Sequence, residues 1–388
     1  MSHPLDPTGE QLLAQARHDT GIDIDDVDIV ERLDRLTASL NSDAKLSEVG
    51  ANAMQKRLLR ILRNRLRMLR DLDAHPEILT QEIRRPIVLS SAPRTGSTKL
   101  HKLLCASGDF LYLNGWKGLT LALRSGDRGE SPEARIAESD DYAEWFNQHA
   151  PGAMAIHEFG SHEPDEESLL FEHCLYAPYL VAFAFIPSYA MWYATTQDFQ
   201  TDLDFMVRAL KYVQWQFHDG DQRRWLLKSP VHLGREQYFA ATVPDTVFVT
   251  TNRDPYSLMA SAASLCKHYQ QAHSDVSADQ FLGPLMLEGF GTSMEQHLAM
   301  RAQHPEINYL DIGYSELTRD AASVTKKVYV HIGETLTTAA SNKMRVWDET
   351  HQQHTRGMHR YQLEDFGLTR AVVDTKFGNY NAQFGDYF

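Results

Sequence analysis

The chain has 388 residues, of which 43% are hydrophobic and 23% are charged, and these proportions exclude an intrinsically disordered protein. The formal net charge of −14 repels nucleic acids and anionic lipids, so we expect no nucleic-acid partner, and any anion that binds requires a local cluster of cations. The three cysteines, Cys105, Cys174 and Cys266, are widely spaced, which excludes a disulfide framework and a paired-cysteine zinc site.

The first 80 residues are predicted to form a helical extension. Asp25 and Asp26 can cap a helix that runs to Leu40, and leucines at helical spacing predict a longer helix from about 46 to 72. The opposite face of this longer helix carries seven Lys and Arg residues. Such a helix can lie on a membrane or bind polyanions, but we favour a solvated face that pairs with carboxylates of the protein itself.

From residue 81 to 388 a strand–turn–helix pattern repeats, with a helical, aromatic-rich insertion at about 110–220. The strand candidates are residues 86–91, 225–228, 246–251 and 307–311. Helices are expected at 95–107, at about 233–241 and 256–268, and after the fourth strand. The repetition predicts an α/β domain of three layers, in which helices cover both faces of a central parallel sheet.

The uncharged segment 175–193 is about as long as a membrane span. Because Pro178 and Pro187 interrupt it, we expect a buried pair of broken helices and no membrane span. The N-terminal residues lack the charged and apolar regions of a signal peptide, which predicts a cytoplasmic protein. A homo-oligomer is compatible with the sequence.

The strongest local signal is SSAPRTGST at residues 90–98, between a predicted strand and a predicted helix. Gly96 allows a ligand to approach the backbone, and the N–H groups at the start of the helix form an anion site. Arg94 supplies a permanent positive charge, while Ser97 and Thr98 supply hydroxyl donors. A Walker A loop has its lysine after the second glycine, so a nucleoside triphosphatase is disfavoured.

A second anion site is predicted after the third strand. Arg253 stands at the carboxyl end of that strand, where ligands bind in open α/β sheets, and Ser261 follows two helical turns later. Both side chains can reach one phosphate. Asp254 and Pro255 also fit a plain helix start, with the acid as cap and the proline at the first helical position, and the two interpretations are compatible.

The order of these motifs, with WLLKSPVHL at residues 225–233 between them, resembles the sulfotransferases that use 3′-phosphoadenosine 5′-phosphosulfate (PAPS). The chain is similar to a bacterial branch whose middle motif reads W-x-x-K-S-P-x-H-L, and the segment 359–367 also resembles that branch. The resemblance covers about residues 86–385. It implies a P-loop-like fold and transfer of a sulfonate from PAPS to the hydroxyl of a small-molecule acceptor, without a metal ion.

The resemblance also implies roles for individual residues. The loop around Arg94 would hold the 5′-phosphosulfate, Arg253 and Ser261 would hold the 3′-phosphate, and Lys228 would lie near the bridging oxygen or the sulfonate. Arg356 resembles a basic residue that closes over the 3′-phosphate, although the Arg-Lys-Gly of the family is only Arg-Gly here. The implied PAPS-binding set is Arg94, Thr95, Gly96, Ser97, Thr98, Arg253, Ser261 and Arg356.

Transfer to a hydroxyl needs a general base, and the sequence offers several candidates. Many cytosolic members of the family place a histidine two residues after the lysine, where this chain has Pro230. Other branches use a glutamate from the helical region after the first motif. We therefore favour Glu166 as the base, with His157 and Glu163 next and His232 last.

The acids around Glu166 have a second interpretation. Pro164 followed by Asp165, Glu166 and Glu167 is typical of a helix start, where carboxylates stabilise the helix dipole. Burial beside the aromatic insertion can instead raise the pKa of a carboxylate, as catalytic sites often require.

The acceptor site is expected in the insertion, whose aromatic side chains offer a large apolar surface. If they line the site, the acceptor is apolar or aromatic, but the same side chains fit a hydrophobic core. They are Tyr176, Tyr179, Phe183, Phe185, Tyr189, Trp192 and Tyr193. Two other functions stay open: a P-loop kinase-like phosphotransferase, which the missing Walker lysine disfavours, and a catalytically inactive nucleotide-binding relative.

Overall fold

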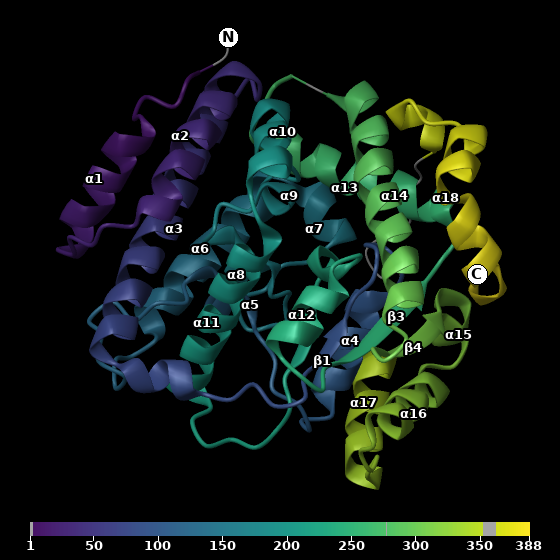
Figure 1. The fold of residues 1–388 in the computed structure, drawn as a ribbon. Coiled ribbons are helices and arrows are strands. Elements are labelled where there is room, and N and C mark those ends of the chain that lie inside the picture. Colours follow the sequence, from purple (N-terminus) through teal and green to yellow (C-terminus); the bar gives the residue numbers. More distant parts are fainter. Residues whose placement is uncertain (1–2, 277, 352–361) are drawn as a thin grey trace.

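A four-stranded parallel sheet organises the second part of the chain (Figure 1). The structure, a computed structural model, describes residues 3–276, 278–351 and 362–388. The strands are β1 (Ile87–Leu89), β2 (Leu226–Lys228), β3 (Val247–Asn252) and β4 (Asn308–Gly313), in the spatial order β2-β1-β3-β4. Every predicted strand is present, and the predicted α/β fold class is confirmed.

Helices form most of the remaining described chain. The N-terminal extension contains α1 (Gly9–Thr20), α2 (Val27–Ser42), α3 (Glu48–Ala74) and the 3-10 turn η1 (Pro76–Thr80). The insertion contains α5 (Gly115–Leu119), α6 (Glu133–His149), α7 (Pro151–Ile156), α8 (Ser168–Glu172), α9 (Ala177–Leu180), α10 (Pro187–Thr196) and α11 (Phe199–Phe217). The sheet region adds α4 (Ser97–Ala106), η2 (Pro230–His232), α12 (Glu236–Thr242), α13 (Pro255–Gln271), α14 (Asp279–Gln303), α15 (Tyr314–Arg319), α16 (Ala321–Ile332), α17 (Thr338–Thr350), η3 (Leu363–Phe366), α18 (Arg370–Phe384) and η4 (Gly385–Tyr387).

The two faces of the sheet bury alternate strand residues, because successive side chains of a strand point to opposite sides. Val88, Leu227 and Phe248 pack into a core shared with the N-terminal helices and the insertion. Ile87 and Val249 pack on the other face, with side chains of α4, α16 and α17. In Figure 1, α1–α3 accordingly lie on one side of the molecule and α16 and α17 on the other. The domain boundary near residue 80 stays a prediction.

Two local predictions hold in position but differ in detail from the structure. The helix expected at about 233–241 is present as α12, but it begins at Glu236, since Gly234 has a left-handed backbone with φ of 78°. A Cβ at Gly234 would lie 2.5 Å from the backbone oxygen of Ser293. Asp26 occupies the cap position of α2 without a capping hydrogen bond, because its carboxylate pairs with Arg65 of α3.

The apolar segment 175–193 forms the broken helical pair that was expected, with α9 and α10 separated by an irregular stretch. The Tyr189 hydroxyl donates a hydrogen bond to the Leu175 carbonyl, which ties the start of the segment to its second helix. Along the described part of the chain, no helix has both the length and the apolar character needed to cross a membrane.

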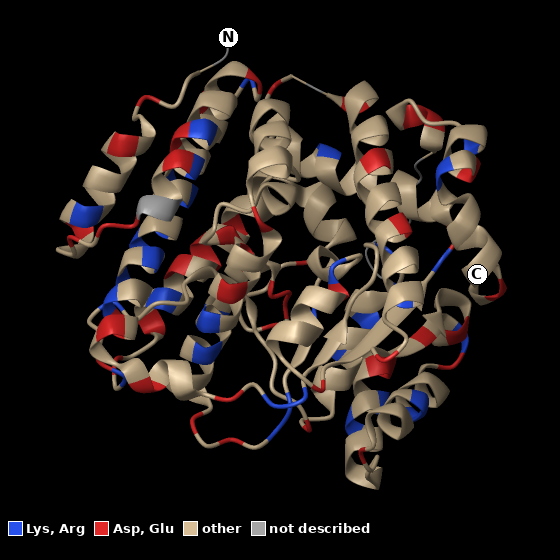
Figure 2. Cartoon of the chain, viewed as in Figure 1, with Lys and Arg blue, Asp and Glu red and all other residues tan. Residues whose placement is uncertain are grey.

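Lys and Arg residues recur along α3 (Figure 2). Arg57 and Arg60 both form ion pairs with Glu172 of α8, and Arg65 pairs with Asp26. The predicted pairing with carboxylates of the protein is therefore confirmed, but the solvated face is wrong here, since all three guanidinium groups are buried. Burial of these charges is tolerable only because each has an acidic partner.

Replacing Glu172 by glutamine is expected to lower the free energy of unfolding by about 3 kcal/mol, because Arg57 and Arg60 lose their buried counter-charge. Burial alone raises the pKa of Glu172, but the two arginines outweigh it and lower that pKa to about 2. This stabilisation is complete above the unfolded-state pKa of about 4.3 and is lost as the pH falls towards 2.

Urea unfolding of both proteins between pH 7 and pH 2.5 tests this expectation. The difference in unfolding free energy should shrink as the pH falls. Glu133→Gln, at an exposed acid of α6, is the matched control and should change stability by less than about 0.5 kcal/mol. A difference that is independent of pH would contradict the ion-pair explanation.

Candidate active site

The three predicted motifs follow the carboxyl ends of β1, β2 and β3. Strand β1 has β2 on one side and β3 on the other, so the chain goes from β1 to β2 on one side and then crosses back past β1 to β3 on the other. In open parallel sheets, ligands bind in the crevice outside the carboxyl ends at such a switch point. Arg94, Lys228 and Arg253 therefore belong to the same edge of the sheet.

The loop after β1 has a left-handed backbone. Arg94 and Gly96 have φ values of 70° and 92°, and a Cβ on Gly96 would lie 3.1 Å from the ring of Tyr314. The Thr95 hydroxyl is 2.6 Å from the Thr251 hydroxyl of β3, which fixes the loop to the sheet. An arginine with a left-handed backbone is conformationally strained, and strained residues of this kind are common at ligand sites. Helix α4 starts directly after the loop, so its first N–H groups are available to an anion.

Arg94 and Arg253 hold each other's segments in place. The Arg253 guanidinium donates to the Arg94 carbonyl (2.9 Å) and lies 4.1 Å from the centre of the Tyr314 ring. The Arg94 guanidinium donates to the Ser261 hydroxyl (2.9 Å) and to the Ile156 carbonyl (3.1 Å). The contact between Arg94 and Ser261 joins the two predicted phosphate-binding sets, and the division into 5′ and 3′ residues stays a prediction.

Lys228 is the last residue of β2, and its ammonium group lies at the same edge. Its Nζ donates to the Thr98 hydroxyl (3.0 Å) and forms an ion pair with Glu166. The side chains of Lys228 and Glu166 are 6% and 16% exposed, so this pair is largely shielded from water. The second oxygen of Glu166 accepts a hydrogen bond from the Ser168 hydroxyl (3.1 Å). The structure thus brings the favoured base and the predicted lysine into direct contact.

Burial and the charges of Lys228 and Glu166 decide the protonation of the ionisable side chains at this pair. Burial raises the pKa of Glu166, but the ammonium outweighs it and the net pKa is lowered, so Glu166 is a carboxylate at neutral pH. Burial and the charge of Glu166 raise the pKa of Asp165 to about 7. Burial lowers the pKa of His157 to about 4, although Glu166 opposes this effect. His157 is therefore a neutral imidazole that lies close to the favoured base.

The remaining base candidates do not share this contact. Glu163 is 47% exposed and pairs with Lys102 of α4 (3.3 Å), while His232 is fully buried against Glu167. The helix start expected at these acids is present, but Glu167 is the N-cap residue of α8, so the acids precede the first turn of this helix. Glu166 lies in the loop before this helix, where its side chain reaches β2.

Comparison with known proteins agrees with this geometry. A family model described as "Sulfotransferase family" matches residues 86–338. This chain belongs to the sulfotransferase family. The crystal structure of sulfotransferase STF1 from Mycobacterium tuberculosis H37Rv is similar, with 26% identity and a TM-score of 0.78 over 97% of this chain and 100% of that chain. Sulfotransferase STF9 from Mycobacterium avium shares the fold, with 22% identity and a TM-score of 0.83 over 97% and 96% of the two chains. A search of curated proteins finds no match.

Most aromatic side chains of the apolar segment are core residues in this sulfotransferase. Tyr176, Tyr189 and Tyr193 are buried in the core that the insertion shares with the N-terminal helices, and the Tyr193 hydroxyl contacts Asp202. Tyr179, Phe185 and Trp192 are partly exposed. The core interpretation therefore holds for most of this set.

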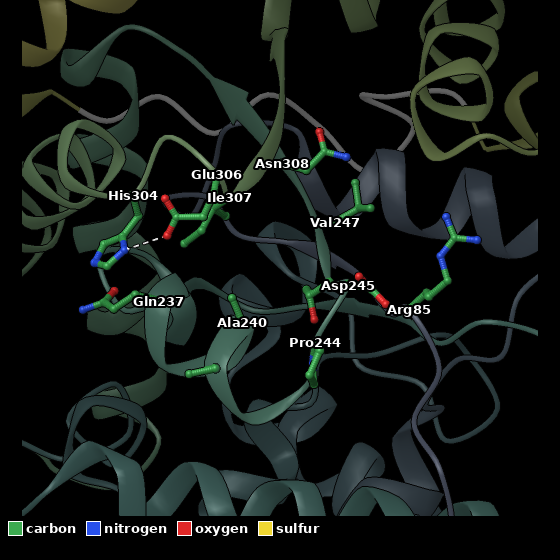
Figure 3. A pocket seen from close by; sticks show the side chains of 12 residues that line it. Arg85, Gln237, Ala240, Pro244, Asp245, Val247, His304, Glu306, Ile307 and Asn308 are labelled. Atoms are coloured by element: carbon green, nitrogen blue, oxygen red, sulfur yellow. Dashed lines mark hydrogen bonds and ion pairs between the residues drawn. The ribbon is translucent and has the colours of Figure 1, made fainter.

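A hollow of about 560 Å³ opens at the opposite edge of the sheet, around the starts of β3 and β4 (Figure 3). Its walls include Arg85, Asp245 and His304, which is paired with Glu306. We do not assign the donor to this hollow, because it lies at the amino ends of the strands. Within the described ranges, no group of three His, Cys, Asp or Glu side chains is arranged to hold a metal ion.

Several residues at the site escaped prediction from the sequence. Tyr314 lies under Arg253, and the Tyr380 hydroxyl of α18 accepts a hydrogen bond from the Arg253 backbone N–H (3.2 Å). Both tyrosines are remote from every motif, so no local pattern could reveal them. Glu167 stands beside the favoured base, and only its contacts distinguish the two acids. Arg356 lies outside the described residues.

Proposed function

We propose that this sulfotransferase takes its sulfonate from PAPS and transfers it to the hydroxyl of a small apolar or aromatic acceptor. The observation that carries the proposal is the network that joins the Arg94 loop, Lys228 and Arg253 at one edge of the sheet. On a protein with a net charge of −14, a cluster of cations is what an anionic nucleotide requires.

The residues present fit a nucleotide with anionic groups on both sides of its ribose. The backbone N–H groups at the start of α4 and the Thr98 hydroxyl suit one anionic group. Arg253 and Ser261 follow β3 and suit the other, and Arg94 contacts both segments. PAPS differs from ATP by carrying a 3′-phosphate, and Arg253 and Ser261 would bind this group.

The donor supplies an activated sulfonate, and the chain supplies positioning, charge and a base. Glu166 accepts the proton of the acceptor hydroxyl while the hydroxyl oxygen forms its bond to sulfur. Lys228 stabilises the charge that develops on the phosphate oxygen as its bond to sulfur breaks. The Thr98 hydroxyl holds the Lys228 ammonium at the loop. In this position the base and the ammonium group can act on the same bound donor and acceptor.

The aromatic character proposed for the acceptor rests on partly exposed aromatic rings of the insertion. Tyr179 packs against Phe183 with ring centres 5.3 Å apart, and Tyr142 packs against Phe159 at the same separation. Tyr142 and Tyr179 are both partly exposed. Aromatic rings of this kind favour a flat or apolar body next to the reacting hydroxyl.

Arg253→Ala is expected to raise the Kd of adenosine 3′,5′-bisphosphate (PAP) about 100-fold, because a charge-assisted contact to phosphate is lost. The Kd of 5′-AMP, which lacks the 3′-phosphate, should change by less than about threefold. Isothermal titration calorimetry on both ligands measures the difference. The wild-type protein should bind PAP without magnesium and more tightly than ATP.

Arg319→Ala, at an exposed arginine of α15, provides the matched loss of charge and should leave both Kd values unchanged. Equal losses for PAP and 5′-AMP would show that Arg253 acts through the Arg94 carbonyl instead of a 3′-phosphate. Tight magnesium-dependent binding of ATP by the wild-type protein would favour the phosphotransferase instead.

A further inference from the structure

Glu166 and Glu167 are neighbours in the chain but contact different parts of Lys228. Glu166 pairs with the ammonium group, whereas Oε2 of Glu167 accepts a hydrogen bond from the Lys228 backbone N–H (2.7 Å). The other oxygen of Glu167, Oε1, lies 2.7 Å from Nε2 of His232. Glu167 and His232 are both completely buried. One short loop therefore holds both the backbone and the side chain of the lysine.

The position of the Lys228 N–H makes this arrangement unusual. Strand β2 has β1 as its neighbour on one side only, and its outer N–H groups need other acceptors. The outer N–H of Leu226 donates to the backbone carbonyl of Leu111 (2.8 Å). Lys228 uses a buried carboxylate instead, which is more costly to desolvate than a carbonyl. Hydrogen bonding of the strand edge alone does not explain the choice of Glu167.

His232 is held in one orientation by its surroundings. Its ring lies between Phe171 of α8 and Phe239 of α12, with ring centres 5.9 Å and 5.0 Å away. We assign its proton to Nε2, because Glu167 offers an acceptor there, whereas Nδ1 has no hydrogen-bond partner among the described residues. A ring fixed in this way can hold Glu167 in place, but it cannot turn towards the Lys228 ammonium.

We propose that Glu167 and His232 are positioning residues that hold Lys228 and Glu166 in the geometry needed for sulfonate transfer. His232 orients the Glu167 carboxylate, Glu167 fixes the Lys228 backbone, and Glu166 is thereby placed against the ammonium group. Because Glu166 and Glu167 share one short loop, a shift of the loop backbone displaces both carboxylates. The inference rests on the proposed function, but it concerns contacts that can be measured without turnover.

The test compares His232→Gln with His232→Asn, because glutamine places its amide nitrogen near the Nε2 position and asparagine places its own near Nδ1. The Lys228 amide should exchange its hydrogen about 10-fold faster in His232→Asn, because the acceptor Glu167 is no longer oriented. The exchange rate should return close to the wild-type value in His232→Gln. NMR with selective 15N-lysine labelling, with the Lys228 signal assigned by its loss in Lys228→Arg, gives this rate.

Kinetics with PAPS and 2-naphthol give the second readout. His232→Asn should lower kcat roughly 10- to 100-fold by misplacing the reacting groups, with an unchanged Kd for PAP, and His232→Gln should recover most of the loss. In a Glu167→Ala background, His232→Asn should cause no further loss of kcat, since His232 acts only through Glu167.

Three outcomes would overturn the proposal. Equal amide exchange in the wild type and His232→Asn would show that His232 does not orient Glu167. Failure of glutamine to restore exchange would assign His232 to packing alone, and a further loss of kcat in the double variant would give His232 a role independent of Glu167. A wild-type protein that does not bind PAP would refute the proposed function, while the amide exchange would still decide the positioning role.

Discussion

Replacing Lys228 by methionine is expected to lower kcat for sulfonate transfer about 1,000-fold, which is typical for the loss of a charge aimed at a developing anion. Methionine keeps the length and the apolar stem of the side chain, but it removes the contacts with Thr98 and Glu166. The Kd of PAP should change less than about 10-fold, since Arg94 and Arg253 keep their positions. A large loss of kcat with a small loss of affinity indicates stabilisation of the transition state.

The same substitution has a consequence for pH dependence. The Lys228 ammonium lowers the pKa of Glu166 against the effect of burial, so its removal should raise that pKa. The acid limb of the residual kcat profile should therefore move to higher pH. Lys99→Met, at a lysine of α4 that pairs with Asp348 (2.8 Å), is the matched control and should keep wild-type kinetics. Lys228→Met with wild-type kcat would refute the assigned role.

Glu166→Gln is expected to reduce kcat about 1,000-fold, because a general base typically contributes factors of 100 to 10,000. The amide keeps the shape of the carboxylate but cannot accept the acceptor's proton at neutral pH. Binding of PAP should be unchanged, since no predicted donor-binding residue depends on this carboxylate for its charge. In the wild type, kcat should stay level on the acid side until the pH drops below the ordinary glutamate pKa of about 4.3, because Lys228 lowers the pKa of Glu166.

Single-turnover and steady-state kinetics with PAPS and 2-naphthol measure this effect. Glu144→Gln, at an exposed acid of α6, controls for the change of charge and should be neutral. Survival of turnover in Glu166→Gln together with its loss in His157→Ala would make the neutral imidazole of His157 the base. Loss of PAP binding in Glu166→Gln would show that this acid organises the donor site instead.

The sequence by itself determined those elements of the fold that depend only on residues close together in the chain. The apolar runs at the four strands, the glycine and arginine of residues 90–98 and the prolines of 175–193 act through backbone preference and short-range periodicity. Strand identity, the loop between β1 and α4 and the broken helical pair were therefore predictable. The parallel order of the strands also placed Arg94, Lys228 and Arg253 at one edge, since the carboxyl ends of parallel strands share an edge.

Only the tertiary structure decided which neighbours these residues meet. Helical periodicity could not show that Arg57 and Arg60 lie buried against Glu172, because it defines a face but not what packs on it. The choice between Glu166 and Glu167 depends on β2, which lies more than 60 residues further along the chain. The sequence likewise could not show that α14 lies against Gly234, where a Cβ would not fit. Burial and long-range contacts decide which side chains are charged, how far their pKa values shift and which neighbours they contact. Both depend on packing between distant segments, which no local sequence pattern encodes.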